Sequence, residues 1–589
     1  MARLSFLILW LFLVQEGPSN SAPQTQGPPQ ESTRYLNTLE SLFDADQAYR
    51  SAEFFTRFWR IGGGPEFDTC VKFIETELTQ LGFQQGQKRG NTKHYFVQED
   101  MPRQKVWIPQ DAVLSLEMPE RRVLHSYAQT PLLLCRNSFP TDRIAPLVHV
   151  EGGDSESDYD QAHVDGSIVL CDAPAAGAYR IAMSKGALGV ISSHVPPHNV
   201  PDQHPDLIAE GSIPYDTTKK SFGLQISRRT AEELLTMMSY QQVKVRIEIQ
   251  TSFALAPIKT LVAELPGTSK QDERVVLVAH LDHYKPGAND NASGSATLLE
   301  ILRSLSKGIE EGDLERPART LTFLWVDEYQ GTGFWMRSHQ EALDKVQAAF
   351  VLDMVGGDPE KTGGVFRVER MPDPSAIWFR YPDQHSGWGA GSWDRAKLFG
   401  SYLNDFYLSI VRERSQTSGW KTTHNVWEGG SDHDPFLWKG VPAILSWHFP
   451  DFAYHSSMDV IDNISPAEMK NAGMSVAASA MMLAVGSEET ARQVLNTVVE
   501  ASTLRMKSLE ELALIELADG QVQGGEMLAT VKKQEKEIIQ AWSTWYRQAI
   551  ESAGTIPAGE VSPEFSALVK KQAEEHQQRF ENLVTALGL

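Results

Sequence analysis

The chain has 589 residues and a mass of 65.7 kDa, enough for three or four domains at roughly 150 residues each, so a small disulfide-stapled scaffold is excluded. It carries 76 acidic and 54 basic residues, a net charge of −22, which is the wrong sign for binding a phosphate backbone. We therefore expect no nucleic-acid partner. With 41% hydrophobic and 22% charged residues, the composition is typical of a folded globular protein.

The first residues have the pattern of an export signal. Arg3 precedes an apolar run that reaches Val14, shorter than the ~20 residues of a membrane span. Small residues up to Ala22 follow where cleavage is expected, so residues 1–22 are predicted to be a signal peptide, with an uncleaved anchor as the alternative. Residues 23–33 are rich in Pro, Gln, Gly and Ser and predict a disordered spacer. No later stretch is apolar enough to span a membrane, which favours an exported, periplasmic or secreted protein.

The chain has only three cysteines, Cys70, Cys135 and Cys171. An odd number cannot close a full disulfide framework, and none of the three has a metal-binding spacing. We interpret them as small core residues.

Short apolar runs alternate with amphipathic helices in residues 34–110 and 255–486, which predicts a mixed, mainly parallel α/β sheet flanked by helices. One helix is predicted over residues 66–82 and another over residues 296–305. The expected strands are Val275 to Ala279, Leu321 to Val326, Phe350 to Leu352 and Val441 to Leu445.

Two regions have a different pattern. Residues 111–254 contain short β-rich runs, which predicts a small β-rich domain inserted into the larger unit. Residues 487–589 have long helical periodicities with interspersed charges, which predicts a helical C-terminal region. This region either caps the core or contacts a partner, including a second copy of the chain, and the pattern does not separate these alternatives.

Metal-ligand residue types follow three predicted strands directly. His280 and Asp282 follow the first strand, Asp327 and Glu328 follow the second, and Asp353 follows the third. Ligands of open α/β sheets gather at the carboxyl ends of the strands, so these side chains are expected at one edge. Taken singly, each has a plainer explanation as a solvated or helix-capping residue, but their common placement favours a site.

Two further candidates complete the set. Asp290 lies in a loop of small residues, Gly287 to Gly294, which permits close backbone approach before a helix. His455 follows the last predicted strand. Two imidazoles and three carboxylates, without cysteine, suit zinc, and five donors can hold two ions if one carboxylate bridges them.

A chain of motifs resembles the co-catalytic di-zinc aminopeptidases, metallopeptidase family twenty-eight. The resemblance covers about residues 33–110 and 255–485, and residues 111–252 resemble the protease-associated domain that often interrupts such enzymes. The motifs are Ala279-His280-Leu281-Asp282, Gly287 to Gly294, Val326 to Gly331, Leu352-Asp353-Met354, Ser431 to Phe436 and Tyr454-His455.

The resemblance implies a zinc exopeptidase fold and two Zn²⁺ per chain. One ion would be held by His280, Asp290 and Asp353, and the other by Glu328, His455 and the shared Asp290. Two such ions polarise a scissile carbonyl and lower the pKa of a bridging water toward ~7.

Two acidic residues receive catalytic roles from the same resemblance. Asp282 matches the carboxylate that accepts a hydrogen bond from the ring of His280. Asp327 matches the general base, although the family usually has Glu there. The missing methylene shortens the reach by about 1 Å, and a misplacement of that size can cost ~100-fold in rate.

His433, in the motif Ser431 to Phe436, has two open interpretations. Its ring either donates a hydrogen bond to substrate at the rim of the site or braces the loop. Trp378, Trp388 and Trp393 likewise either line a pocket for an apolar side chain or pack against the sheet.

The sequence therefore predicts an exported zinc aminopeptidase that removes residues from the amino end of peptides through a zinc-bridged water. One alternative is an acyltransferase like the glutaminyl cyclases, which share the fold and work with one zinc. The other is a binding module whose catalytic site has weakened, an interpretation that the Asp at position 327 keeps open.

Overall fold

The computed structural model describes residues 31–87, 90–389 and 391–589. The predicted signal peptide lies outside these residues. The first helix, α1 (Glu31–Leu42), already includes residues 31–33, so the predicted spacer is too long by three residues at its end. Within the described part, no helix combines the length and apolar character needed to cross a bilayer.

The main domain, residues 31–105 and 255–486, is built on a nine-stranded mixed sheet. Its four central strands, β12, β11, β13 and β16, run parallel to one another. All are buried over most of their length, as expected for parallel strands covered on both faces. In spatial order the strands are β1 (Gln84–Gln85), β2 (His94–Asp100), β10 (Ile258–Leu265), β12 (Arg319–Val326), β11 (Lys270–His280), β13 (Val346–Leu352), β16 (Ala443–Phe449), β14 (Val365–Glu369) and β15 (Thr422–Asn425).

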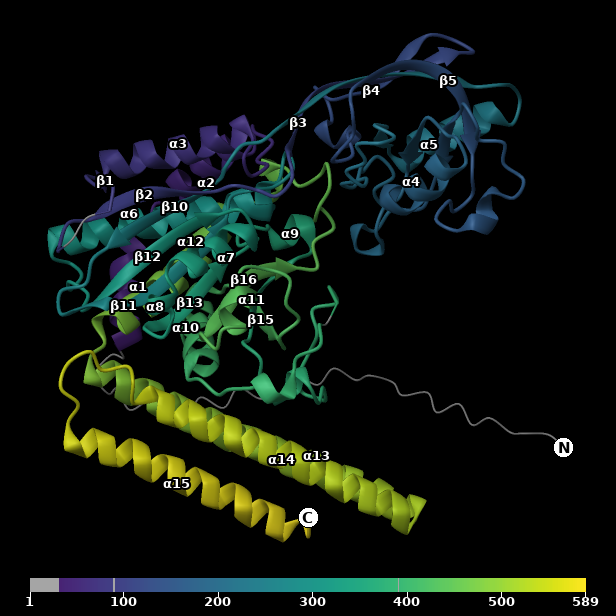
Figure 1. Ribbon diagram of the computed structural model, residues 1–589. Helices are drawn as coiled ribbons and strands as arrows, with labels where there is room; N and C mark the ends of the chain where they lie inside the picture. The colour runs from purple at the N-terminus through teal and green to yellow at the C-terminus, as the bar shows by residue number, and fades with distance from the viewer. Residues whose placement is uncertain (1–30, 88–89, 390) are drawn as a thin grey trace.

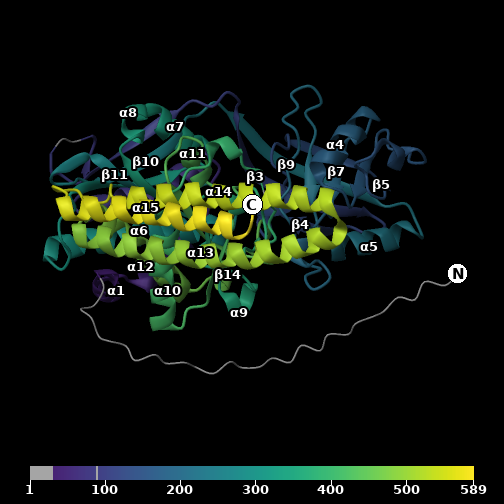
Figure 2. The same cartoon turned by 90° about the horizontal axis from the view of Figure 1, so that it is seen from below.

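Helices cover both faces of this sheet (Figure 2). On one face, α6 (Gly294–Glu311) and α12 (Pro466–Val485) contact each other and the central strands. On the other face lie α7 (Gln330–Ser338) and α11 (His433–Leu437). The remaining helices of the main domain are α2 (Ala45–Phe55), α3 (Pro65–Gln80), α8 (Gln340–Leu343), α9 (Pro359–Thr362) and α10 (Leu403–Ser418). The predicted α/β fold class is confirmed.

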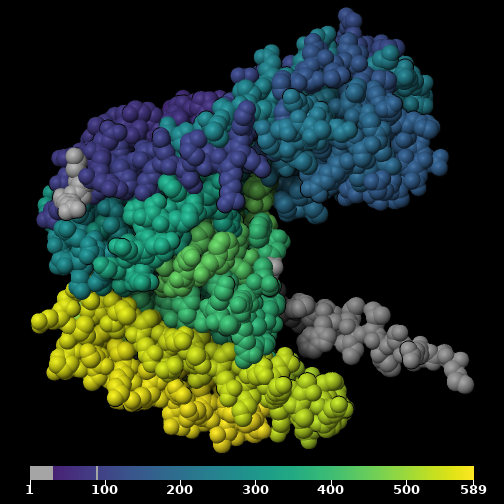
Figure 3. Space-filling view, viewed as in Figure 1, coloured from purple at the N-terminus to yellow at the C-terminus, as the bar shows by residue number. Residues whose placement is uncertain are grey.

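The inserted domain, residues 106–254, forms a separate lobe beside the main domain (Figures 1 and 3). It begins with β3, five residues before the predicted boundary, and ends with β9, which pairs with β3 in antiparallel register. Its strands are, in spatial order, β4 (Arg122–Ser126), β3 (Val106–Met118), β9 (Lys244–Ala254), β5 (Thr141–His149), β6 (Ile168–Cys171), β7 (Gly189–Ser192) and β8 (Gly223–Gln225), and its helices are α4 (Ala175–Ser184) and α5 (Arg228–Met238). The three cysteines are buried free thiols, as predicted for core residues.

The C-terminal region, residues 487–589, consists of three long helices, α13 (Glu488–Gln523), α14 (Gly525–Ala553) and α15 (Pro563–Ala586). Gly524, with a φ of 112°, turns the chain between α13 and α14, a conformation that only glycine adopts readily. The hairpin of α13 and α14 packs along the main domain and extends past the end of α15 (Figure 1). Buried ion pairs fix it there, with Arg505 of α13 bonded to Asp383 at 2.9 Å.

Candidate metal centre

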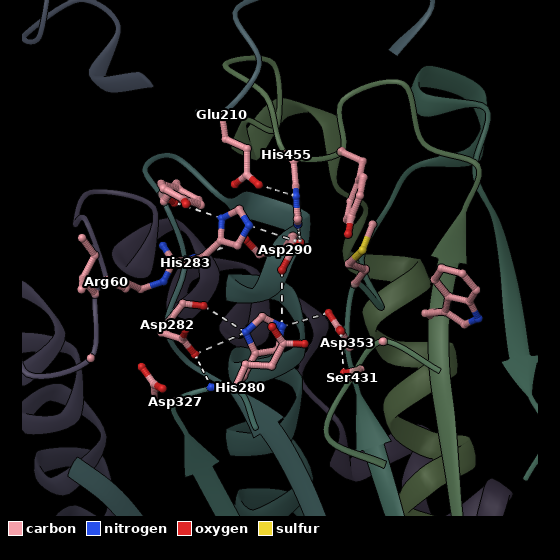
Figure 4. A pocket seen from close by; sticks show the side chains of 18 of the residues that line it. Arg60, Glu210, His280, Asp282, His283, Asp290, Asp327, Asp353, Ser431 and His455 are labelled. Carbon is pink, nitrogen blue, oxygen red and sulfur yellow. Dashed lines mark hydrogen bonds and ion pairs between the residues drawn. The ribbon is translucent and has the colours of Figure 1, made fainter. Parts of the chain in front are cut away.

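The carboxyl ends of three parallel strands bring the predicted residues to one edge of the sheet (Figure 4). His280 is the last residue of β11, and β11 lies between β12 and β13. Asp327 directly follows β12 and Asp353 directly follows β13. His280, Asp327 and Asp353 thus lie at the carboxyl ends of neighbouring parallel strands, at the edge where their sequence positions predict them.

His280 lies at the centre of one group of donors. Its Nε2 is 3.1 Å from Oδ1 of Asp353 and 3.4 Å from Oδ1 of Asp290. All three side chains are buried, and Ser431 Oγ donates to the other oxygen of Asp353 at 2.7 Å. Burial lowers the pKa of His280, but the charge of Asp353, the interactions with the Asp282 and Asp353 side chains and the charge of Glu328 together outweigh it, and the net pKa lies well above the usual value. The site thus favours positive charge between these groups.

A tightly held loop presents Asp290. The backbone N–H groups of Asn289 and Asp290 both donate to the carboxylate of Asp459, at 2.7 and 3.0 Å. The Asn291 side chain donates to the backbone oxygen of Leu352 at 2.9 Å and so ties the loop to the end of β13. A side chain at Gly294 would come within 2.3 Å of the same oxygen, which explains a glycine at the start of α6.

A second group of donors faces the other oxygen of Asp290. His455 Nε2 lies 3.0 Å and His283 Nε2 3.2 Å from Asp290 Oδ2. Burial opposes ionisation of Asp290, but these two imidazoles hold its pKa well below the usual range. Asp290 is therefore an anion between two sets of imidazole donors.

The inserted domain supplies another member of this group. Glu210 Oε1 lies 2.9 Å from Nδ1 of His455. The ligand atoms of Glu210, His283 and His455 lie within 4.8 Å of one another, as do those of His280, Asp290 and Asp353. Sequence reasoning missed both Glu210 and His283. The position of His283, next to Asp282 in the loop after β11, was a signal that could have indicated it, whereas Glu210 has no local motif.

Several donor atoms at this centre lack hydrogen-bond partners. Oδ1 of Asp290, Nε2 of His283 and Oε2 of Glu210 are buried and accept or donate no hydrogen bond. Buried polar atoms are costly unless satisfied, and these belong to the two groups of donors described above. Imidazole nitrogens and carboxylate oxygens in this arrangement fit a borderline divalent cation such as zinc.

Glu328 lines the same cavity but belongs to neither group of three. Its backbone N–H donates to Oδ1 of Asp282 at 2.7 Å. Burial, together with the charge of Asp353, raises the pKa of its carboxyl well above the usual value, against the opposing effect of His280. The predicted role of Glu328 as a ligand beside His455 stays a prediction.

Asp282 differs in detail from its expected role. His280 Nδ1 lies 2.9 Å from the backbone oxygen of Asp282 and 3.6 Å from its Oδ1. The short contact is thus to the main chain, and the carboxylate instead accepts from the N–H of Glu328. The backbone of Asp282 thus contacts the ring more closely than its carboxylate does, and the predicted role of that carboxylate in orienting His280 stays a prediction.

Asp327 is buried at the wall of the cavity. A Cβ at Gly62 would lie 2.0 Å from its Oδ2, so a glycine leaves the room for this carboxylate. Burial and the neighbouring charge of Asp282 raise the pKa of Asp327 well above the usual value, while Arg136 opposes the shift. The backbone of Gly62 thus packs closely against the shorter Asp327 side chain. The predicted role of Asp327 as general base stays a prediction.

His433 is fully buried and does not line the cavity. Its Nε2 lies 2.9 Å from Oε1 of Glu369, at the end of β14. The tentative substrate-binding role of His433 is therefore corrected in favour of the bracing alternative, because a fully buried ring bonded to Glu369 cannot present a donor to substrate.

The donors open into a cavity of about 350 Å³. Main-domain residues form most of its wall, and Arg136 and Glu210 extend into it from the inserted domain. Of the three tryptophans considered above, only Trp388 lines it; Trp393 packs edge-on against Trp427 at 4.8 Å, and Arg395 lies over Trp378. The cavity is large enough for the end of a peptide rather than a folded protein.

Residues 260–480 match the model of peptidase family M28. This segment of the chain is therefore similar to that family. The matched segment carries all five predicted ligands, as well as His283.

Individual relatives are distant. Nicalin of Caenorhabditis elegans is 25% identical over 240 residues, which cover 36% of this chain and 38% of that protein. Aminopeptidase YwaD of Bacillus subtilis is 27% identical over 259 residues, 42% of this chain and 48% of that protein. The chain thus matches less than half the length of these two curated relatives.

A solved structure has a similar fold over a longer stretch of the chain. BSAP, a zinc aminopeptidase from Bacillus subtilis, superposes with a TM-score of 0.51 at 19% identity, covering 74% of this chain and 94% of that chain. At this level of sequence identity, the superposition shows a similarity of fold alone.

Proposed function

We propose that this protein is a zinc-dependent aminopeptidase of the M28 type that hydrolyses the first peptide bond of peptides. The observation that carries the proposal is the environment of Asp290, whose two oxygens face separate imidazoles, His280 on one side and His455 on the other. A bridging carboxylate of this kind is what a pair of cations requires. The name of the relative YwaD supports aminopeptidase chemistry.

The predicted ligands fit zinc by donor type. His280, Asp290 and Asp353 would hold one ion, and Asp290 and His455 contribute to a second. When bound, such a pair supplies Lewis-acid polarisation of a peptide carbonyl and lowers the pKa of water.

The protein's own groups handle the proton. A carboxylate with a raised pKa is suited to take a proton from an attacking water and return it to the departing amine, because its pKa is closer to neutral pH. Asp327 has this property and faces the cavity. The backbone of Gly62 lies close to its Oδ2, and this close packing limits the loss of precision that the shorter side chain would cause.

The cavity also favours a cationic substrate end. Asp327, Glu328 and Glu210 line it, so a protonated amino terminus entering the cavity meets carboxylates on several sides. Trp388 provides an apolar wall suited to a side chain of the first residue.

A panel of aminoacyl-p-nitroanilides, assayed with zinc-loaded protein, tests the proposal. We expect hydrolysis of at least one member of the panel and no hydrolysis of the amino-acetylated analogues. The variant Asp290→Asn should lose both its activity and its bound zinc. Cyclisation of an N-terminal glutamine peptide with one zinc bound would instead support the acyltransferase alternative. No reaction with any substrate at full zinc loading would support the binding module.

Export forms part of the same proposal and rests on the pattern from Arg3 to Val14. Expression of the full sequence in a secreting host, followed by mass spectrometry of the mature amino terminus, tests it. Retention inside the cell would contradict export and leave the peptidase proposal intact.

A further inference from the structure

The inserted domain docks directly on the loop that carries His455. The backbone N–H of Glu210 donates to the backbone oxygen of His455 at 2.8 Å, and that of Ser457 donates to Ile208 at 2.8 Å. A bridge between Ala209 and Ser456 lies between these two bonds. Asn199 adds two side-chain bonds to backbone oxygens of the same loop, at 2.7 and 2.8 Å.

This docking fixes the ring of His455. The backbone of His455 has a φ of 52°, a conformation that few residues other than glycine adopt, and the strand-like contact with the inserted domain holds it there. The side chain of Glu210 then meets Nδ1 of His455 at 2.9 Å. A carboxylate that accepts from Nδ1 selects the tautomer whose Nε2 carries a free electron pair, and this Nε2 faces Asp290 (Figure 4).

His283 approaches the same oxygen of Asp290 beside His455. Its ring lies 5.3 Å from the ring of His455, centre to centre, and its side chain is only 9% exposed. Nδ1 contacts the backbone oxygen of Tyr284 at 3.1 Å, which leaves Nε2 as the acceptor. That Nε2 has no hydrogen-bond partner and points into the centre.

The backbone around His283 is rigid. Arg60 and His283 exchange two backbone hydrogen bonds of 2.9 Å, and the buried guanidinium of Arg60 donates to the backbone oxygens of Leu281 and Gly287, at 2.8 Å each. The imidazole is therefore held in place before any ion binds, as a ligand must be for tight binding.

We propose that the second ion is held by Nε2 of His283, Nε2 of His455 and Oδ2 of Asp290, with Glu210 of the inserted domain positioning His455. This inference rests on the proposed function, since it concerns the second ion of the same site. It differs from the ligand set that the family resemblance implies, in which Glu328 takes the place of His283. It also makes the inserted domain part of the metal centre through a positioning residue.

The test compares the zinc content of full-length variants after dialysis against buffered Zn²⁺. We expect two ions in the wild type and in Glu328→Gln, and one in His283→Ala. His149→Ala, an exposed histidine of the inserted domain, is the control and should keep two. Near-ultraviolet circular dichroism checks folding, and His283→Asn is the second variant if His283→Ala does not fold.

The role of Glu210 is tested by the affinity for the second Zn²⁺ rather than by the number of ions bound. Glu210→Gln should bind the second Zn²⁺ about 10- to 100-fold more weakly, the usual effect of losing the carboxylate behind a ligating imidazole, and Glu210→Asp should recover part of the loss. Glu248→Gln, on the exposed face of the same domain, is the matched control. In Co²⁺-loaded protein, Glu210→Gln should shift the visible absorption of the second ion only.

Two results would overturn the inference. One is that His283→Ala, or His283→Asn in its place, still binds two ions while Glu328→Gln loses one. The other is that Glu210→Gln binds the second Zn²⁺ with unchanged affinity. Failure of the proposed function would look different, because Asp290→Asn would then keep both ions and any activity.

Discussion

The inserted domain and the C-terminal region attach to the same main domain, but only the inserted domain reaches the cavity. Glu210 and Arg136 of the inserted domain line it, whereas none of the described lining residues comes from residues 487–589. The C-terminal helices instead dock through buried charges, including Arg505 with Asp383 and Arg380 with Glu535. We infer that the inserted domain contributes to the chemistry of the cavity, whereas the C-terminal region contributes to the stability of the fold. The following experiments test this difference.

The largest effect on activity is expected from a substitution in the main domain, and it serves as the reference for substitutions in the inserted domain and the C-terminal region. Asp327→Asn removes the proton acceptor and should lower kcat/KM for an aminoacyl-p-nitroanilide by about 100- to 10,000-fold. Zinc content should not change, because Asp327 belongs to neither group of donors. Asp344→Asn, an exposed aspartate, is the control. Unaltered turnover would remove Asp327 from the mechanism.

A large effect on stability alone is expected at the C-terminal region. Arg505→Met leaves the buried Asp383 with one guanidinium partner, Arg370, instead of two. Loss of one partner from a buried pair costs about 3 kcal/mol, which urea unfolding followed by circular dichroism can measure. Zinc content and kcat/KM should remain those of the wild type. A change in either would show that this region also influences the metal centre.

A smaller, pH-dependent effect is expected at the same interface. Burial raises the pKa of Asp405 to about 7, and its Oδ2 has no hydrogen-bond partner. The folded state therefore holds a proton that the unfolded state releases near pH 4, so this group costs stability progressively as pH rises from about 4 to 7. Asp405→Asn should stabilise the protein by about 1–3 kcal/mol at pH 8 and hardly at pH 4.5. Equal urea midpoints of variant and wild type at pH 8 would contradict this prediction.

The smallest effect tests the inserted domain. The positive charge of Arg136 lowers the pKa of Asp327, so Arg136→Ala should raise it. Because the base must be ionised, the acidic limb of the pH profile of kcat/KM should move to higher pH. Arg143→Ala, an exposed arginine of the same domain, should leave the profile unchanged. A shift to lower pH would show that Arg136 acts in some other way.

The sequence was most informative where one geometric rule applies. His280, Asp327 and Asp353 directly follow buried runs that form parallel strands, and parallel strands end at one edge, so local pattern was enough to bring them together. The boundaries were less exact, since β3 begins at Val106 and α1 includes the end of the predicted spacer.

What the sequence missed depends on docking between distant segments. Glu210 lies 245 positions before His455 along the chain, and only the contact between the inserted domain and the His455 loop brings them together. The two interpretations of His433 stayed open at the sequence level for a similar reason, because its burial against Glu369 depends on how β14 packs. Such contacts leave no periodicity or spacing that a single sequence could reveal.

The most direct test of the central claim is the number of zinc ions bound per chain in the wild type and in Asp290→Asn. The structure places Asp290 between two sets of donors, so two ions should bind to the wild type and fewer than one should remain tightly bound in the variant. Two tightly bound ions in Asp290→Asn would contradict the shared-carboxylate centre.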